Sequence, residues 1–297
     1  MRIVVTGMEG QVARAMAERG DEHGHDIVRL GRPALDLTAN SVAIDAALAA
    51  ARPDLIVAAA AYTAVDQAES ERDLAFSVNA TGAGAVAHAA RRLGVPLVHL
   101  STDYVFGGDK EAPYVESDET RPQTVYGASK LAGEQLVLAT QADSAILRTA
   151  WVFSPFGSNF VRTMLRLAAT RDQIGVVQDQ WGNPTSAFDI ADAILTVAGN
   201  LLTDRDPRLR GIFHMASSVA TNWAAFAEAI FALSAARGGP TAGVRAIATS
   251  DYPTAAPRPR NARLDCTLLE RTHGVRLGDW RAPLDAVIAR LVTPVQG

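Results

Sequence analysis

The chain has 297 residues, 48% of them hydrophobic, and a formal net charge of −4 from 28 basic and 32 acidic side chains. It is long enough to bury a sizeable core, and its negative charge argues against a general nucleic-acid-binding surface. The single cysteine, Cys266, excludes an internal disulfide and a cysteine-based zinc cluster. The apolar residues 1–7 are too short for a signal peptide, and no stretch approaches the ~20 apolar residues of a membrane span, so we expect a cytoplasmic protein that contacts no membrane.

Short apolar runs alternate with alanine-rich helical runs along the first half of the chain. We predict strands at 2–6, 26–30, 54–60, 97–102 and 144–153, and helices from about 11 to 19, within 71–94 and from about 126 onward. This alternation is typical of parallel strands joined by crossover helices, and strands that are apolar on nearly every residue are expected to be covered on both faces. We therefore predict an α/β fold with a Rossmann-like, doubly wound parallel sheet.

Proline, glycine, serine and asparagine become frequent at residues 154–159, which indicates a domain boundary. Beyond it we predict a strand near 174–178, a helix near 189–200, a short strand at 211–215 and a helix at 223–236. We expect residues 1–153, together with about 173–208, to form the sheet domain. The rest of 154–297 is expected to form a smaller, discontinuous C-terminal domain that binds the substrate.

The turn after the first strand has the spacing of a nucleotide-binding loop. Residues 4–16 read VVTGMEGQVARAM, so Gly7, Gly10 and Ala13 follow the pattern G-x-x-G-x-x-A between a strand and a helix. Small residues there let the backbone approach a pyrophosphate, which the free N–H groups and the positive end of the helix stabilise. The alternative is a tight turn without a ligand. Because the turn opens a βαβ unit, we favour an NAD(P)-binding domain.

The end of the second strand bears on the choice of cofactor. It reads VRLGRP, with Arg29 and Arg32 close together and no acid between Ile27 and Leu35. Proteins that prefer NAD usually place an acid here for the ribose 2′-hydroxyl, whereas NADP-binding proteins offer an arginine to the 2′-phosphate. We therefore predict that NADPH is preferred and that Arg32 contacts it. Alternatively, Arg29 points into a neighbouring helix and Arg32 is an exposed loop charge.

Residues 126–130 read YGASK at the start of a predicted helix. Residues four apart share a helix face, so the phenol of Tyr126 is expected beside the ammonium of Lys130. A neighbouring positive charge favours the ionised phenol, which suits a proton donor that works near neutral pH. The alternatives are a simple surface contact, or an ion pair between Lys130 and Glu134.

Several segments together resemble the extended short-chain dehydrogenase/reductases: TGMEGQ (6–11), AAAYT (59–63), Asn79 in SVNATG, STDYVFGG (101–108) and YGASK. Within that superfamily, three further blocks are similar to the dTDP-4-dehydrorhamnose reductases: RTAWVFSPFGSNFV (148–161), QWGNPTSAFDIA (180–191) and PRNARLD (259–265). The resemblance spans nearly the whole chain. It implies NAD(P)H-dependent reduction of the C4 ketone of dTDP-4-dehydro-L-rhamnose to dTDP-L-rhamnose, with NADPH preferred and NADH also accepted.

The resemblance also implies roles for individual residues. Tyr126 would protonate the sugar C4 oxygen, Lys130 would hold the nicotinamide ribose and lower the pKa of Tyr126, and Thr102 would orient the carbonyl. The remaining cofactor contacts would come from the phosphate turn, the adenine side and the third strand end: Gly10, Gln11, Val12, Asp36, Leu37, Ala61, Tyr62 and Thr63. The remaining substrate contacts would come from the sugar side and the nucleotide side: Asp103, Trp151, Asn159, Asn183, Thr185 and Arg258.

The sequence departs from its relatives in two places. Gly107 stands where relatives usually have aspartate. Some relatives dimerise through a magnesium site built from glutamates near the first helix and the C-terminus, but here no acid precedes Glu18 in the first helix and residues 285–297 contain no glutamate. We therefore expect no metal site, and a monomer or weak homodimer whose partner is a dTDP-sugar and not a nucleic acid.

Two other functions remain compatible with the sequence. One is a different nucleotide-sugar enzyme of the same superfamily, such as an epimerase. The other is a non-catalytic regulatory subunit that binds a dinucleotide.

Overall fold

The computed structural model describes residues 1–292. Its larger lobe is built on a six-stranded sheet in the order β10-β5-β4-β3-β1-β2, in which every neighbouring pair is parallel. The strands are β1 (Arg2–Thr6), β2 (Asp26–Leu30), β3 (Leu55–Ala58), β4 (Leu97–Thr102), β5 (Ser144–Thr149) and β10 (Gly211–His214). The order reverses between β1 and β3, where a doubly wound sheet forms a ligand crevice at its carboxyl edge. The predicted Rossmann-like α/β sheet is confirmed.

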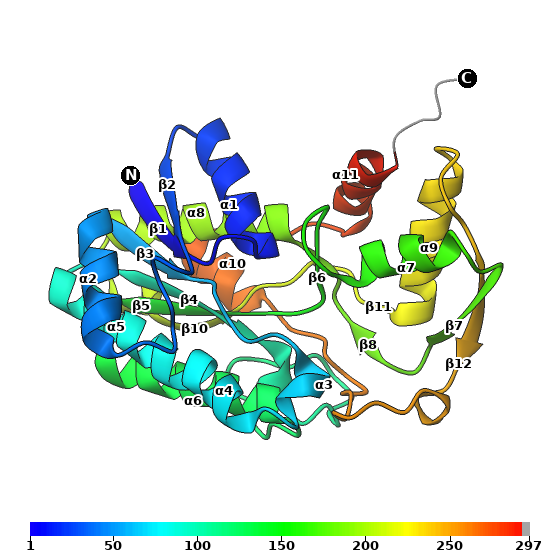
Figure 1. Cartoon of the computed structure of the whole chain (residues 1–297), viewed down its shortest axis with the longest axis horizontal. Coiled ribbons are helices and arrows are strands. Elements are labelled where there is room, and N and C mark those ends of the chain that lie inside the picture. The colour runs from blue at the N-terminus through cyan, green and yellow to red at the C-terminus, as the bar shows by residue number, and fades with distance from the viewer. Residues whose placement is uncertain (293–297) are drawn as a thin grey trace.

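Both faces of the sheet are covered by helices, as its apolar strands predicted. Alternate side chains such as Ile3 and Val5 pack with α1 (Gln11–Glu22), α8 (Ala187–Thr203) and α10 (Thr267–His273). Their neighbours, such as Val4, pack on the other face with α2 (Ser41–Ala51), α5 (Ala83–Leu93) and α6 (Val125–Thr140). Figure 1 shows α1 and α8 above the sheet and α2, α5 and α6 below it.

The smaller lobe has its own core. It contains α7 (Phe160–Ala168), β7 (Gln173–Val177), α9 (Trp223–Ala235), β12 (Gly243–Ile247) and α11 (Arg281–Leu291). β7 pairs in parallel with β12, and Ile174 and Val176 of β7 pack against aromatic residues such as Phe226 and Trp280. Two short strand pairs lie between the lobes: β6 (Val152–Phe153) with β9 (Thr185–Ser186), and β8 (Trp181–Gly182) with β11 (Thr221–Asn222).

These pairings correct the expected domain boundaries. We expected residues from about 173 to 208 to return to the sheet domain, but β7 belongs to the smaller lobe because its apolar face is buried against α7 and α9. The chain returns to the sheet domain only with α8, which packs on α1. It stays there past residue 208, because β10 pairs with β5.

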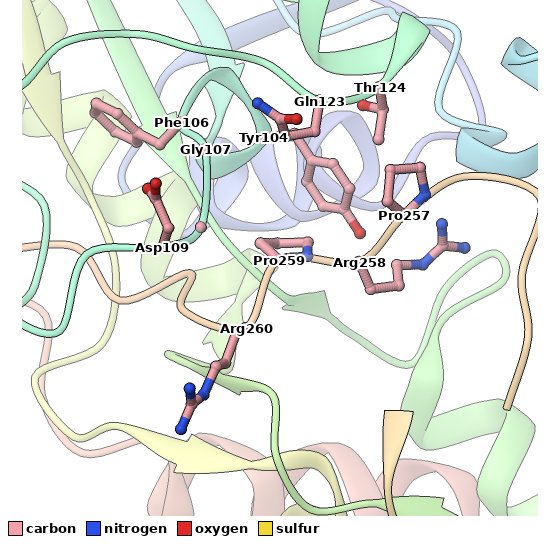
Figure 2. A pocket seen from close by; sticks show the side chains of 11 residues that line it. Tyr104, Phe106, Gly107, Asp109, Gln123, Thr124, Pro257, Arg258, Pro259 and Arg260 are labelled. Carbon is pink, nitrogen blue, oxygen red and sulfur yellow. The ribbon is translucent and has the colours of Figure 1, made fainter. Parts of the chain in front are cut away.

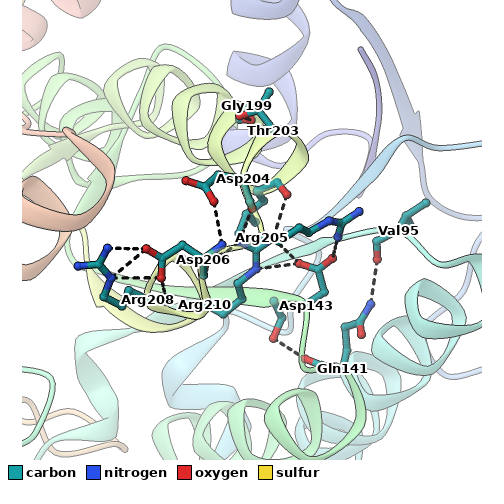
Figure 3. A network of polar contacts seen from close by, with 12 residues as sticks. Val95, Gln141, Asp143, Gly199, Thr203, Asp204, Arg205, Asp206, Arg208 and Arg210 are labelled. Carbon is teal, nitrogen blue, oxygen red and sulfur yellow. Dashed lines mark hydrogen bonds and ion pairs between the residues drawn. The ribbon is translucent and has the colours of Figure 1, made fainter.

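Side-chain hydrogen bonds fix the last strand of the sheet at its amino-terminal end (Figure 3). The Asp143 carboxylate, just before β5, accepts from Arg205 Nη1 at 2.8 Å and from Arg210 Nε at 2.9 Å. Arg210 also donates to the Leu201 carbonyl at 2.9 Å, which ties the end of α8 to the same point. This network lies at the edge of the sheet opposite the crevice, so it stabilises the frame and not the site.

Three further segments lie between β3 and α5 in the chain and pack against α6: the short helix α3 (Val65–Ala68), the helix α4 (Arg72–Phe76) and a π-helical turn over Ser77–Gly82 that leads into α5. Within residues 1–292, no helix has both the length and the apolar character needed to cross a membrane.

Candidate active site

The three predicted catalytic residues meet at the carboxyl edge of the sheet. Thr102 is the last residue of β4, and Tyr126 and Lys130 lie in the first turns of α6. The Thr124 hydroxyl accepts from the Gly127 N–H at 2.9 Å, so α6 begins just before Tyr126. The buried Lys130 Nζ donates to the Leu100 carbonyl at 2.6 Å. The expected alternative, an ion pair between Lys130 and Glu134, is not formed.

Burial sets the protonation states of these groups. It raises the pKa of Tyr126 to about 12, and the nearby Thr102 hydroxyl offsets only part of that rise. It lowers the pKa of Lys130 to about 8, although the Glu134 carboxylate opposes the shift. The expected lowering of the Tyr126 pKa by Lys130 is therefore wrong for this structure, because desolvation raises that pKa and Lys130 is not among the groups that shift it. Near neutral pH, Tyr126 carries its proton and Lys130 is charged.

Two glycines bring α6 against the strand ends. A Cβ at Gly127 would lie 2.2 Å from the Tyr104 carbonyl oxygen, and a Cβ at Gly133 would lie 2.1 Å from the Asn79 carbonyl oxygen. Neither distance is possible for a real side chain, so both positions need glycine. The helix carrying Tyr126 therefore packs backbone to backbone on the loop after β4 and on the π-helical turn.

Asn79 is a site residue for which we predicted no role of its own. Its Oδ1 accepts from the Tyr62 N–H at 2.8 Å, and its Nδ2 donates to the Tyr62 carbonyl at 3.0 Å and to Ser129 Oγ at 2.9 Å. These bonds hold the segment after β3, where Ala61, Tyr62 and Thr63 were predicted to contact the cofactor. They also join that segment to α6, in the turn of Lys130.

The glycine turn has the form that a pyrophosphate needs. Gly7 has a φ of 105°, and a Cβ at Gly10 would meet nothing within 4 Å. The α1 helix has no side-chain cap and no acid in its first turn, so its first N–H groups have no side-chain acceptor among residues 1–292. The Gln11 side chain bonds to Ser154 and Asn159 instead, which leaves its backbone N–H to a ligand. Val12 packs against the sheet core.

The loop after β2 brings Arg32 near Asp36. Hydrogen bonds from the Thr38 backbone and hydroxyl, together with the charge of Arg32, lower the pKa of Asp36. Arg32 is exposed and makes no hydrogen bond or ion pair with any other residue up to 292. Arg29 donates to the Met8 carbonyl at 2.6 Å, so it supports the glycine turn and does not point into a helix. The Leu37 carbonyl lies against Gly82, where a Cβ would approach it to 2.7 Å.

A cavity of about 780 Å³ lies between the lobes. Residues of both lobes line it, among them Thr63, Asp66, Tyr104, Trp151, Asn159, Trp223 and Arg258. Four of these residues were predicted to contact ligands, whereas Asp66, Tyr104 and Trp223 were not. Tyr104 lies in the STDYVFGG segment, which could have drawn attention to it. A nucleotide-sized ligand fits a space of this volume.

Trp151 is held in a strained position in this cavity. Its φ is 47°, which ends the strand that we predicted to continue from 144 to 153. Its indole stacks on Trp223, with 3.5 Å between ring centroids and 10° between planes, and a Cβ at Gly182 would lie 2.4 Å from its ring. The stack on Trp223 covers one ring face, and the indole leaves no room for a side chain at position 182.

Asp103 and Arg258 have contrasting surroundings. Asp103 is buried, and its Oδ1 accepts from the Thr102 hydroxyl at 2.9 Å, whereas its Oδ2 has no partner among residues 1–292. Burial raises the pKa of this carboxyl to about 7, although the Thr102 hydrogen bond opposes the shift. The Arg258 guanidinium, a predicted substrate contact, pairs with the Asp66 carboxylate at the cavity wall.

Two predicted substrate ligands, Asn183 and Thr185, are buried and hydrogen-bonded within the protein. Asn183 donates to the Ser217 carbonyl at 2.9 Å and accepts from the Leu264 N–H at 3.3 Å. The Thr185 hydroxyl donates to the Asn183 carbonyl at 2.9 Å. These bonds join the segments around β9 and β10, and a contact of either side chain with substrate stays a prediction. Asn159 lines the cavity, but it also caps α7 by accepting from the Arg162 N–H.

A second cavity of about 350 Å³ lies beyond Tyr104 (Figure 2). Its wall includes Gly107, the residue that departs from the family pattern. A Cβ there would lie 3.1 Å from Asp109 Oδ1 and 3.2 Å from Arg121 Nε, the two sides of an ion pair. Asp109 therefore supplies an acid beside the position where relatives have their aspartate.

No group of three or more His, Cys, Asp or Glu side chains within residues 1–292 is arranged to hold a metal ion. Part of the C-terminal segment on which our expectation rested, 293–297, lies outside the described residues.

A doubly wound parallel sheet whose strand ends meet a YGASK helix defines an extended short-chain dehydrogenase/reductase. The sequence matches the family described as RmlD substrate binding domain over residues 1–293. The chain belongs to this family, the dTDP-4-dehydrorhamnose reductases, and the predicted resemblance is confirmed.

Individual relatives are similar over nearly their whole length. A dTDP-4-dehydrorhamnose reductase of Sinorhizobium fredii is 49% identical over 280 residues, which cover 94% of each chain. A crystal structure of a dTDP-4-dehydrorhamnose reductase from Clostridium acetobutylicum has a TM-score of 0.90 and 35% identity, covering 98% of this chain and 99% of that one. The Bacillus anthracis enzyme in complex with NADP also has a TM-score of 0.90 and 35% identity, covering 97% and 99%.

Proposed function

We propose that the protein reduces the C4 ketone of dTDP-4-dehydro-L-rhamnose to the alcohol of dTDP-L-rhamnose, with NADPH as the reductant. The observation that carries the proposal is the meeting of Thr102, a protonated Tyr126 and a charged Lys130 at the carboxyl edge of a dinucleotide-binding sheet. The name shared by the relatives supports the choice of substrate. A cytoplasmic location belongs to the same proposal.

The chain's own residues divide the work of cofactor binding. The first N–H groups of α1 bind the pyrophosphate over Gly10, where the space is open. Arg32 binds the 2′-phosphate, and Lys130 binds the nicotinamide ribose. When bound, NADPH supplies the hydride that adds to C4. The NADP held by the Bacillus anthracis relative supports this choice.

The proton comes from the protein. When the ketone binds, the Thr102 hydroxyl turns from Asp103 to the ketone oxygen, donates a hydrogen bond to it and orients it. Tyr126 gives its phenolic proton to that oxygen as the C4 carbon is reduced. The charge of Lys130 stabilises the phenolate that is left, which then regains a proton from water. In sum, the ketone gains one hydride and one proton, and the cofactor leaves as NADP⁺.

The epimerase alternative and the regulatory-subunit alternative give different results in one assay. NADPH oxidation is followed by absorbance with dTDP-4-dehydro-L-rhamnose, and the product is identified by mass. We expect stoichiometric oxidation and a product with two additional hydrogens. An epimerase would return an isomer of unchanged mass without net oxidation, and a regulatory subunit would bind NADPH without turnover. Either result would exclude the proposed reaction.

Tyr126→Phe is the companion variant, because it keeps the ring and removes the proton. We expect kcat to fall by about 10²–10⁴, while NADPH affinity, measured by fluorescence, stays close to that of the unmodified protein. Full activity in this variant would remove Tyr126 from the mechanism.

A further inference from the structure

We propose that Glu134, fixed by its ion pair with Arg148, is a positioning residue that keeps a carboxylate one helical turn from Lys130, supports the charge of that ammonium and ties α6 to the loop of Thr102. The inference rests on the proposed function, because it assigns a task to Lys130. It adds a residue one helical turn beyond YGASK, together with a partner from the neighbouring strand.

The pair is buried and bidentate. Arg148 Nε donates to Glu134 Oε1 at 2.9 Å and Nη2 donates to Oε2 at 2.6 Å. The Arg148 and Glu134 side chains are only 2% and 1% exposed. Two such charges are costly to bury, and bonds of this geometry are needed to offset the desolvation. The Glu134 carboxylate is therefore fixed in one orientation.

Glu134 lies four residues after Lys130, on the same face of α6. Lys130 makes its hydrogen bond to the Leu100 carbonyl and not to Glu134, so the carboxylate acts through its charge. That charge raises the pKa of Lys130 against the larger lowering by burial. Without it, the buried amine would lose its proton more readily.

Among the charged and titratable groups around Lys130, Glu134 is the acid whose charge favours the protonated amine. On α6 these groups are Tyr126 and Glu134 themselves. On β4 the buried His99 is neutral, because burial and the Lys130 charge hold its pKa well below its usual range. On β5 Arg148 is positive, and in the loop after β4 Asp103 keeps its proton up to about pH 7. Asp103 is not among the groups that shift the pKa of Lys130.

Arg148 extends the arrangement to the catalytic loop. Its guanidinium carbon lies 5.0 Å from the centre of the Phe106 ring, and Phe106 stacks on Tyr114 with 4.3 Å between ring centroids. Phe106 is four residues after Thr102. One buried pair therefore fixes the helix of Tyr126 and Lys130 relative to the loop that begins at Thr102.

The test compares Glu134→Gln, which keeps the shape and removes the charge, with Glu134→Asp, which keeps the charge. Glu228→Gln, an exposed glutamate of α9, is the control. Two quantities are measured against pH: kcat/KM for NADPH oxidation, and NADPH affinity by fluorescence. Thermal unfolding is followed in parallel. In both profiles the measured value should fall at high pH as Lys130 loses its proton. We expect the midpoint of this fall, the alkaline limb, to move to lower pH by about one unit in Glu134→Gln. It should stay near its original position in Glu134→Asp and in Glu228→Gln.

A second variant covers the case in which Glu134→Gln does not fold, since it leaves Arg148 buried and unpaired. The double variant Glu134→Gln/Arg148→Met removes both charges and should still show the lowered limb. A fall in melting temperature with an unmoved limb would overturn the inference, because the pair would then serve the fold alone. A protein that binds NADPH but does not reduce the dTDP-sugar would contradict the proposed function, while the binding profile would still decide the role of Glu134.

Discussion

At the residue scale, Asp103 combines deep burial with an unpartnered oxygen next to the proposed proton donor. Its pKa of about 7 lies well above that of an exposed aspartate, because desolvation outweighs the Thr102 hydrogen bond. The folded protein therefore keeps this proton at pH values where the unfolded chain has lost it. The contribution of this proton to the free energy of unfolding is fully present below about pH 4 and is lost as the pH rises to about 7.

Asp103→Asn should remove this pH dependence, because the amide is neutral at every pH. We expect the melting temperature of the variant, relative to the unmodified protein, to rise between about pH 4 and pH 7 and then to stay level. Asp21→Asn, at an exposed aspartate of α1, serves as the control and should show no such trend. A constant difference for Asp103→Asn across that range would show that Asp103 is already ionised near pH 4.

Arg32 is the residue on which cofactor choice depends. It is exposed, and among residues 1–292 the nearby Asp36 is the carboxylate whose pKa it affects. We expect kcat/KM to favour NADPH over NADH by about 5- to 30-fold, and Arg32→Ala to remove most of that preference by weakening NADPH. Arg91→Ala, at an exposed arginine of α5, should leave the ratio unchanged. Equal values for the two cofactors in the unmodified protein would contradict the prediction.

The sequence was informative about residues that lie inside a motif and much less so about the others. The YGASK motif identified Tyr126 and Lys130, and the end of the strand before Asp103 identified Thr102, each from a short stretch of sequence. The direction of the Tyr126 pKa shift was wrong, because burial depends on what packs over the residue. Asn183 was assigned to substrate by resemblance, and its hydrogen bonds to Ser217 and Leu264, far along the chain, were not predictable from its local sequence.

At the element scale, the close packing of α6 is the feature most sensitive to sequence. Gly133 faces the Asn79 carbonyl at a distance that excludes a Cβ, whereas Gly199, inside α8, has nothing within 4 Å of the same position. Both are interior glycines of long helices, so they form a matched pair.

Gly133→Ala should destabilise the fold by about 1–3 kcal/mol and lower kcat, because α6 must move away from the π-helical turn and carry Tyr126 with it. Gly199→Ala should raise the stability by about 0.5–1 kcal/mol, since alanine restricts the unfolded chain and meets no obstacle, and it should leave kcat unchanged. Urea unfolding and steady-state kinetics measure both effects. Equal stability changes for the two substitutions would mean that α6 is not packed as closely as described.

The sequence predicted most elements of the sheet but not all their limits. Helix α2 was missed, although Asn40 caps it by accepting from the Ala43 N–H at 2.9 Å, a signal that the sequence does carry. The strand from 144 was predicted too long, because Trp151 has a positive φ that its local sequence does not reveal. The apolar pattern of β7 could not show to which lobe the strand belongs, because the pattern suits the large sheet and the β7–β12 pair equally well.

At the scale of the whole molecule, the two ends of the sheet have separate tasks. The Asp143 network fixes the amino ends of β5 and β10, whereas the carboxyl ends carry the candidate site. The smaller lobe meets the larger one through ion pairs that cross between them, Arg258 with Asp66 and Arg290 with Glu18. Figure 1 shows the two lobes side by side. We place the sugar in the cavity between them.

The proposed reaction transfers the hydride of NADPH to the sugar C4 beside Tyr126, whose ring centroid lies 5.5 Å from that of the cavity residue Tyr104. The most direct measurement uses NADPH that carries deuterium at the transferred position of its nicotinamide C4, with dTDP-4-dehydro-L-rhamnose as substrate, and locates the label by mass and NMR. We expect a dTDP-L-rhamnose about 1 Da heavier than the product made with unlabelled NADPH, with the deuterium on sugar C4. A product without deuterium, or with deuterium on another carbon, would contradict the proposed reaction.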